Sequence, residues 1–215
     1  MATPTDILTL SQWFSPAFPV GAFSYSHGLE HAIDVGDVQS LKDTLDWIED
    51  VLRYGAGWND CLVLGAAYRA EDAHTLADID AQSRALAASR ERLQETDLQG
   101  AAFCRAISAL AQIDLHGLTY PVAAGRAARL ENIPLGLTTQ MFLQSLLINF
   151  ASVAMRLVPL GQSDGQLVIQ TLTPICISIA DAALETDLDS LGSTAFLSDI
   201  AAMRHETQYS RIFRT

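Results

Sequence analysis

The sequence predicts an all-α protein, a single domain of roughly eight to ten helices packed around a central apolar helix. Apolar residues recur at helical spacing along most of the 215 residues. The sequence has no alternating runs of Val, Ile and Thr bounded by hairpin turns, which would predict strands. The chain is long enough for one domain with a substantial core, and its 49% hydrophobic and 18% charged residues form a globular composition.

In the first half of the chain, helical spacing is interrupted by recognisable start and stop residues. Ser40 is placed to cap the helix that follows it, and Gly55 and Gly57 mark a break before the next helix. The predicted helices of this half are 5–14, 41–54, 59–71, 75–90 and 93–113. Residues 116–122 (HGLTYPV) then end the helical pattern.

In the second half, the predicted helices are 121–131, 137–158 and 166–185. Pro121 suits a first helical turn, and Pro174 is expected to kink the last of these helices. Residues 133–155 carry no charge and are long enough to span a bilayer. Polar side chains interrupt this segment, so we expect a buried central helix rather than a membrane span.

Charge excludes some classes of partner. The formal net charge is −12, which repels phosphate backbones and argues against nucleic acid. Lys42 is the one lysine, and no glycine-rich loop ends in it, so we do not expect the chain to bind nucleotide itself. No cofactor is expected.

The cysteines indicate a reducing compartment. Cys61, Cys104 and Cys176 are odd in number, far apart and embedded in apolar runs, which predicts buried free thiols. The first ten residues lack the basic and apolar parts of a secretory signal. We therefore expect a cytoplasmic protein.

Residues 15–30 (SPAFPVGAFSYSHGLE) combine turn residues with large apolar side chains. Pro16 and Pro19 prevent a regular helix. The apolar groups, which include Phe23 and Tyr25, must be covered by something. The segment is either a loop packed on its own core or a rigid apolar loop presented to a partner.

Residues 203–215 (MRHETQYSRIFRT) differ in charge from everything before them. They carry a net charge of +2, whereas residues 1–202 carry −14. We therefore divide the chain into an all-helical domain, 1–202, and a basic docking tail, 203–215. Its aromatic residues and arginines are of the types that anchor interfaces. The tail docks on a partner, folds back on its own chain, or stays disordered, and composition leaves these alternatives open.

A second motif invites a catalytic interpretation. GQSDG at 161–165 matches the Gly-x-Ser-x-Gly elbow of serine hydrolases, with Ser163 as nucleophile. That chemistry requires a strand before the serine and a helix after it, whereas the preceding segment has helical spacing. The sequence favours a link between two helices in which Ser163 or Asp164 caps the second.

Two histidines have the spacing of a metal site. If 24–34 is helical, His27 and His31 lie on one face, with Glu30 nearby. A third ligand is not evident, so ordinary surface or packing use is favoured and we predict no metal site. No catalytic group stands out among the acidic runs at 43–50 and 181–189.

The segment 13–30 (WFSPAFPVGAFSYSHGLE) resembles the N-terminal signature of the UreF family of urease accessory proteins. The resemblance continues in family order over almost the whole chain. The further stretches are YPVAAG at 120–125, RLVPLGQSDGQ at 156–166 and MRHETQYSRIFRT at 203–215. His31 is not part of the family pattern, which weakens the case for a metal site.

The resemblance implies an all-α homodimer without enzymatic activity. Such proteins join UreD (also called UreH) and then recruit the GTPase UreG, and the assembly delivers nickel to apo-urease. The tail becomes ordered against UreD, which by position points to Tyr209, Arg211, Phe213 and Arg214. The N-terminal signature joins the same contact, which points to Phe23 and Tyr25.

Overall fold

The computed structural model describes residues 2–215, which form ten α-helices, two short 3₁₀ helices and no strand. The predicted all-α class is confirmed. The helices are α1 (Pro4–Trp13), η1 (Ala22–Ser24), α2 (Leu29–Asp34), α3 (Leu41–Tyr54), α4 (Ala56–Arg69), α5 (Ala73–Ala85), α6 (Arg90–Ala111), α7 (Tyr120–Leu130), α8 (Leu135–Leu157), α9 (Gln162–Leu184), η2 (Leu188–Ser190) and α10 (Phe196–His205).

Local capping explains several helix starts. Ser40 Oγ accepts the backbone N–H of Asp43 at 3.2 Å, and α3 has the bounds that its apolar spacing predicts. Pro121 lies in the first turn of α7. At α9, the Asp164 carboxylate accepts the backbone N–H of Gly161 at 3.0 Å, which starts the helix four residues earlier than predicted. The helix continues through Pro174.

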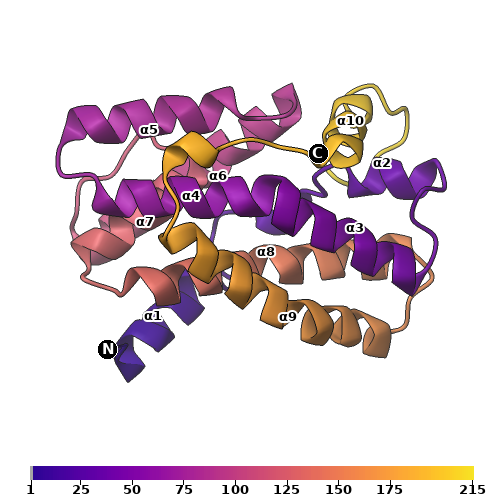
Figure 1. The fold of residues 1–215 in the computed structure, drawn as a ribbon, viewed down its shortest axis with the longest axis horizontal. Helices are drawn as coiled ribbons and strands as arrows, with labels where there is room; N and C mark the ends of the chain where they lie inside the picture. The colour runs from indigo at the N-terminus through magenta and orange to yellow at the C-terminus, as the bar shows by residue number, and fades with distance from the viewer. Residues whose placement is uncertain (1) are drawn as a thin grey trace.

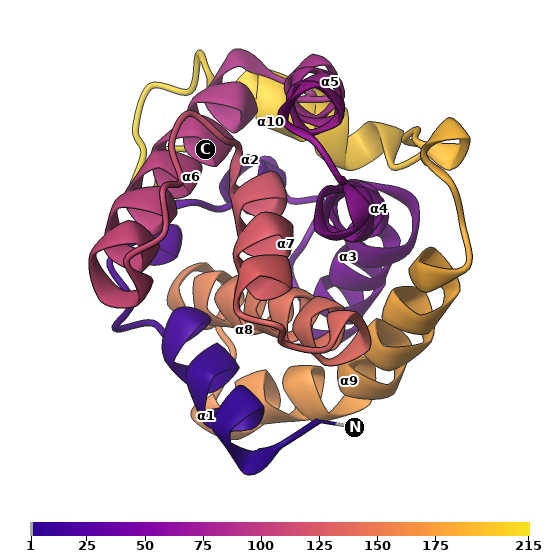
Figure 2. The same cartoon turned by 90° about the vertical axis from the view of Figure 1, so that its left-hand side faces the viewer.

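The helices are arranged in layers, and α7 and α8 are the most enclosed of them. In Figure 1, α3 and α4 cross the middle of the molecule, with α5 and α6 on one side and α8 and α9 on the other. Seen end-on, α7 and α8 lie inside a ring made by the other helices (Figure 2). Helix α8, predicted as the central helix, packs against α1, α2, α3, α4, α7 and α9.

Helix α7 shares the centre because its side chains are small. Ala123, Ala124, Ala127 and Ala128 are completely buried. Gly125 faces α4 so closely that a Cβ atom would lie 2.2 Å from the carbonyl oxygen of Leu64. The α4–α7 contact is therefore set by backbone-to-backbone approach.

Among the described residues, one helix has the length and hydropathy of a membrane span, and it is α9. Only a third of its most apolar stretch is buried. The core helix of a water-soluble protein can meet the same criterion. The uncharged segment 133–155 becomes the start and body of α8 instead.

Helix α10 was not anticipated. It ends at His205, so the first three residues of the predicted tail, 203–205, belong to a helix. The non-helical end of the tail, 206–215, passes α2 and the start of α6. This places the C-terminus beside the N-terminal signature.

Candidate interaction site

The end of the tail lies beside the second half of the N-terminal signature, near α2 (Figure 1). The backbone N–H of Arg214 donates to the carbonyl of Ser24 at 2.8 Å, and the N–H of Ser26 donates to the carbonyl of Thr215 at 2.9 Å. The hydroxyl of Ser26 also donates to that carbonyl. The tail therefore folds back on its own chain, one of the three alternatives that composition left open.

Glu30, the last residue of the signature, is the main polar contact of the tail. One carboxylate oxygen accepts the backbone N–H of Ile212 at 2.6 Å, and the other accepts that of Phe213 at 2.9 Å. The second oxygen also lies 3.0 Å from Nε2 of His205. A carboxylate buried this deeply is costly unless its oxygens are bonded, and these three donors satisfy it.

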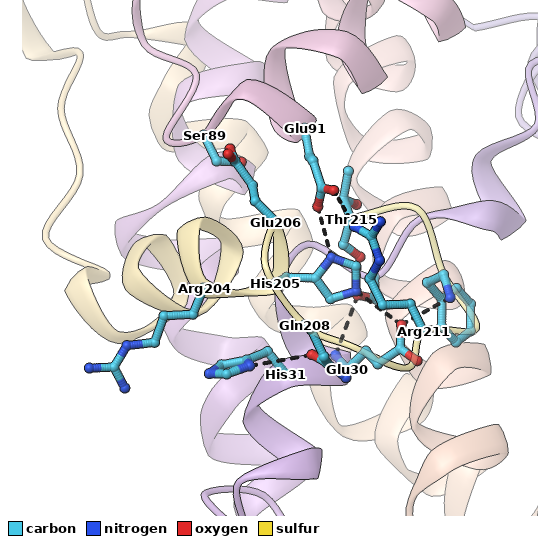
Figure 3. A network of polar contacts seen from close by, with 12 residues as sticks. Glu30, His31, Ser89, Glu91, Arg204, His205, Glu206, Gln208, Arg211 and Thr215 are labelled. Carbon is cyan, nitrogen blue, oxygen red and sulfur yellow. Dashed lines mark hydrogen bonds and ion pairs between the residues drawn. The ribbon is translucent and has the colours of Figure 1, made fainter.

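His205 extends the network to α6 (Figure 3). Its ring is completely buried, and Nδ1 lies 2.8 Å from a carboxylate oxygen of Glu91. The other oxygen of Glu91 accepts from Arg211 Nη1 at 2.5 Å. Both ring nitrogens face carboxylates and can donate together only in the doubly protonated ring. The network therefore runs from Arg211 through Glu91, His205 and Glu30 to the amides of Ile212 and Phe213, and both of its ends belong to the tail.

The six expected partner-facing residues divide into two groups. Tyr25 and Phe213 are only 5% and 4% exposed, so the chain itself covers both side chains. Phe213 joins the main core cluster, and its ring centroid lies 5.7 Å from the guanidinium carbon of Arg156. Burial, together with the charge of Glu95, raises the pKa of Tyr25.

The remaining expected residues face solvent. Phe23 is 57% exposed, and Tyr209 is fully exposed. Arg211 and Arg214 are exposed as well, although Arg211 is paired with Glu91. The tail therefore turns one set of side chains inward and another outward.

An apolar face of α10 is exposed as well, and no signal used in the sequence analysis pointed to it. Phe196, Leu197, Ile200 and Met203 are all exposed. Three of them, Phe196, Ile200 and Met203, have the i, i+4, i+7 spacing that defines one face of a helix. That spacing is the signal that could have found both the helix and its outward face.

A cavity of about 180 Å³ lies behind the signature. Aromatic side chains line one part of it, and His27, Asp60, Arg92 and Glu95 line another. Thr215 reaches its wall, since its hydroxyl donates to Glu95 at 3.1 Å. The end of the tail is thus part of the structure around this cavity.

Two carboxyl groups of the cavity have pKa values shifted in opposite directions. Burial alone would raise the pKa of Glu95, but the charges and hydrogen bonds of Arg92 and His27 outweigh it and lower that pKa to about 2. Burial raises the pKa of Asp60 to about 7, since the opposing effect of Arg92 is smaller. Burial and the charge of Arg92 also lower the pKa of His27.

The suggested pair of metal-binding histidines does not form. His27 has a left-handed backbone conformation (φ 56°), and α2 begins only at Leu29, so the condition for this pair, a continuous helix over 24–34, is not met. Nε2 of His27 lies 2.8 Å from Glu95, whereas Nδ1 of His31 lies 3.3 Å from Gln208. Within residues 2–215, no three His, Cys, Asp or Glu side chains form a metal-binding group.

The GQSDG motif is a link between helices. Ser163 lies in the first turn of α9, α8 precedes the link, and Asp164 makes the capping bond described above. The described part of the chain contains no strand that could support a nucleophile elbow. The structure thus favours the helix-link interpretation over the hydrolase one.

The three cysteines are free and buried, as predicted. Burial raises the pKa of all three thiols, to about 12 for Cys176. None of them therefore has the character of a reactive thiolate.

Comparison with known proteins gives a consistent result. The family model described as UreF matches residues 38–173. A curated relative from Ruegeria pomeroyi, named urease accessory protein UreF, is 57% identical over 217 aligned positions that cover all of both chains. Relatives of the same name from Ruegeria sp. and Roseobacter denitrificans are 50% and 49% identical, and cover 99% and 97% of this chain and 100% and 93% of their own. The chain belongs to the UreF family of urease accessory proteins.

Proposed function

We propose that this chain is a non-enzymatic scaffold and GTPase regulator in urease maturation. It binds UreD (UreH), the pair recruits the GTPase UreG, and the assembly delivers nickel to apo-urease. Membership of the UreF family supports this role, because the curated relatives carry the name urease accessory protein. We also propose that the chain acts as a homodimer in the cytoplasm.

The observation that carries the docking part of the proposal is the presence of exposed apolar side chains on the tail, on the signature and on α10, the helix that leads into the tail. Tyr209 and Ile212 project from the tail itself, and Phe23 projects from the signature. The outward face of α10 adds four more. Exposed apolar groups are typical of interaction surfaces, and aromatic residues dominate the binding energy of such surfaces.

The assignment of GTP hydrolysis to UreG rather than to this chain follows from the sequence. It has one lysine and no glycine-rich phosphate loop, so GTP hydrolysis is assigned to UreG. The contribution of this chain is then to position UreG and to alter its rate of hydrolysis. The nickel ion is cargo of the assembly rather than a cofactor of this chain.

The docking surface can be tested by removing outward side chains that do not hold the tail. The double variant Tyr209→Ala, Ile212→Ala is expected to weaken UreD binding about tenfold or more, since exposed anchors carry much of the energy of an interface. The matched control is Leu8→Ala, Leu110→Ala, which removes two exposed apolar side chains from α1 and α6. Affinity for purified UreD is measured by calorimetry, with circular dichroism to verify the helical fold.

If the Tyr209, Ile212 variant binds UreD within twofold of the wild type, the docking surface is assigned wrongly. Regulation is tested by the rate of GTP hydrolysis of UreG with UreD, in the presence and absence of this chain. An unchanged rate contradicts the regulator role. Sedimentation equilibrium tests the homodimer, which requires twice the 23.3 kDa chain mass.

A further inference from the structure

We propose that Glu30 is the positioning residue of the docking surface. Its buried carboxylate holds the tail at Ile212 and Phe213 and so fixes where the outward side chains stand. The inference rests on the proposed function for the identity of the partner. The intramolecular part can be tested without any partner.

The first argument is the direction of the backbone at the contact. The N–H groups of Ile212 and Phe213 are consecutive, and both point to the carboxylate of Glu30, at 2.6 and 2.9 Å. The side chain of Phe213 enters the core, whereas that of Ile212 faces solvent with 74% exposure. Two consecutive amides held by one carboxylate fix a bend in the backbone at these residues, so Glu30 decides which side chain points outward.

The second argument is that Glu30 itself is held in place. His205 contributes Nε2 to the same carboxylate, and its Nδ1 meets Glu91 on α6. Glu30 lies on α2 and His205 on α10, so one carboxylate joins two helices to the tail. Figure 3 shows His205 between the two glutamates. The position of the tail is therefore linked to that of the apolar face of α10.

The third argument concerns energy. Hydrogen bonds to a buried charged acceptor are among the stronger contacts of a folded chain. In Glu30→Gln, one of the two oxygens becomes an NH₂ group that faces a donor, so at least one tail amide loses its acceptor. The substitution keeps the size of the side chain, so its effect is confined to polar contacts.

The test uses the isolated full-length chain first. We expect Glu30→Gln to raise hydrogen–deuterium exchange of peptides from 206–215 about tenfold or more, with exchange in α4 and α7 unchanged. The matched control is Asp34→Asn, which removes one negative charge from an exposed position on the same helix. Equal tail exchange in the two variants overturns the proposal.

A second variant keeps the proposal falsifiable if Glu30→Gln does not fold. Glu91→Gln changes the outer member of the network, which is less buried than Glu30. It is expected to raise tail exchange by a smaller factor, about threefold. Tail exchange at the wild-type rate in this variant also overturns the proposal.

A double-mutant cycle on UreD binding distinguishes a positioning role of Glu30 from a merely structural one. Phe213→Ala removes the buried anchor of the tail, and we expect it to weaken UreD binding about tenfold. If Glu30 acts through the tail, adding Glu30→Gln to this variant weakens binding by no more than a further twofold. Fully additive losses mean that Glu30 acts elsewhere, and they overturn the proposal.

Failure of the inference and failure of the proposed function give different results. If UreD binding is insensitive to Phe213→Ala and to the Tyr209, Ile212 double variant, the docking function is wrong, whatever the exchange data show. If those variants weaken binding but Glu30→Gln leaves binding and tail exchange unchanged, the docking function stands and the positioning role is wrong.

Discussion

The centre of the helical domain and the junction of signature and tail are held together in different ways. At the centre, α7 contacts α4 through glycine and alanine, and the backbones approach closely. At the junction, the tail is held mainly by hydrogen bonds to Glu30 and to the backbone of the signature, with Phe213 as its buried aromatic anchor.

This difference predicts that the centre of the domain and the junction open at different free energies. Close packing depends on shape and changes little with pH or salt. Bonds to carboxylates depend on charge, and a segment with one apolar anchor opens at lower free energy than a packed core. The tail can therefore detach or be rearranged by a partner while the helical domain stays folded.

The largest effect is expected at the centre, from Gly125→Ala. The added Cβ would lie 2.2 Å from the backbone oxygen of Leu64, and a backbone atom cannot move aside as a flexible side chain can. We expect a loss of about 3 kcal/mol in unfolding free energy and a fall of about 10 °C in Tm. The control is Gly192→Ala, where a Cβ meets nothing within 4 Å. Equal melting temperatures for the two variants would show that the α4–α7 contact yields easily.

The half-buried carboxyl of Asp60, which has no hydrogen-bond partner within the described residues, gives a second comparison with Glu30. Asp60 has no hydrogen bond or ion pair within the described part of the chain, and its pKa is raised to about 7. The folded chain therefore keeps a proton that the unfolded chain releases between about pH 4 and pH 7. Stability contributed by this group is present below pH 4 and is lost as the pH rises to 7 and above.

Asp60→Asn removes the carboxyl group whose ionisation destabilises the folded chain as the pH rises. We expect the variant to be about 2–4 kcal/mol more stable than the wild type at pH 8 and to have nearly equal stability at pH 4. Urea unfolding at the two pH values measures the difference. A variant that is less stable at pH 8 would show that the folded chain stabilises the ionised carboxylate of Asp60, and would contradict this prediction.

Local signals predicted the centre better than the junction. Ser40 and the apolar spacing after it give both ends of α3, because capping and periodicity are properties of neighbouring residues. The contact of Glu30 with Ile212 joins residues 182 positions apart and leaves no periodic pattern. The left-handed conformation of His27 also belongs to the junction, since its N–H donates to Thr215 at 3.3 Å.

Resemblance to a family supplied what local signals did not. It pointed to the signature and the tail as one surface, and the structure brings these two segments together. It did not indicate that Tyr25 and Phe213 would be buried by the chain itself. Which side chains point outward is decided by tertiary contacts, above all by the consecutive amides on Glu30.

The smallest effect is expected from the exposed edge of the network. Arg211→Gln removes the ion pair with Glu91, in which the Arg211 side chain is 37% exposed. Because water and salt screen such a pair, we expect tail exchange to rise only about twofold to threefold at low ionic strength. In 1 M NaCl the variant and the wild type should exchange alike.

The matched control for this last change is Arg204→Gln, an exposed arginine that forms no ion pair within the described residues. It removes the same charge from α10 without touching Glu91. If both variants raise tail exchange equally, the effect is one of overall charge. If only Arg211→Gln raises it, and salt abolishes the difference, the network has a screened outer bond and a buried inner one. The tail would then loosen stepwise from Arg211 inward, with Glu30 the last contact to break.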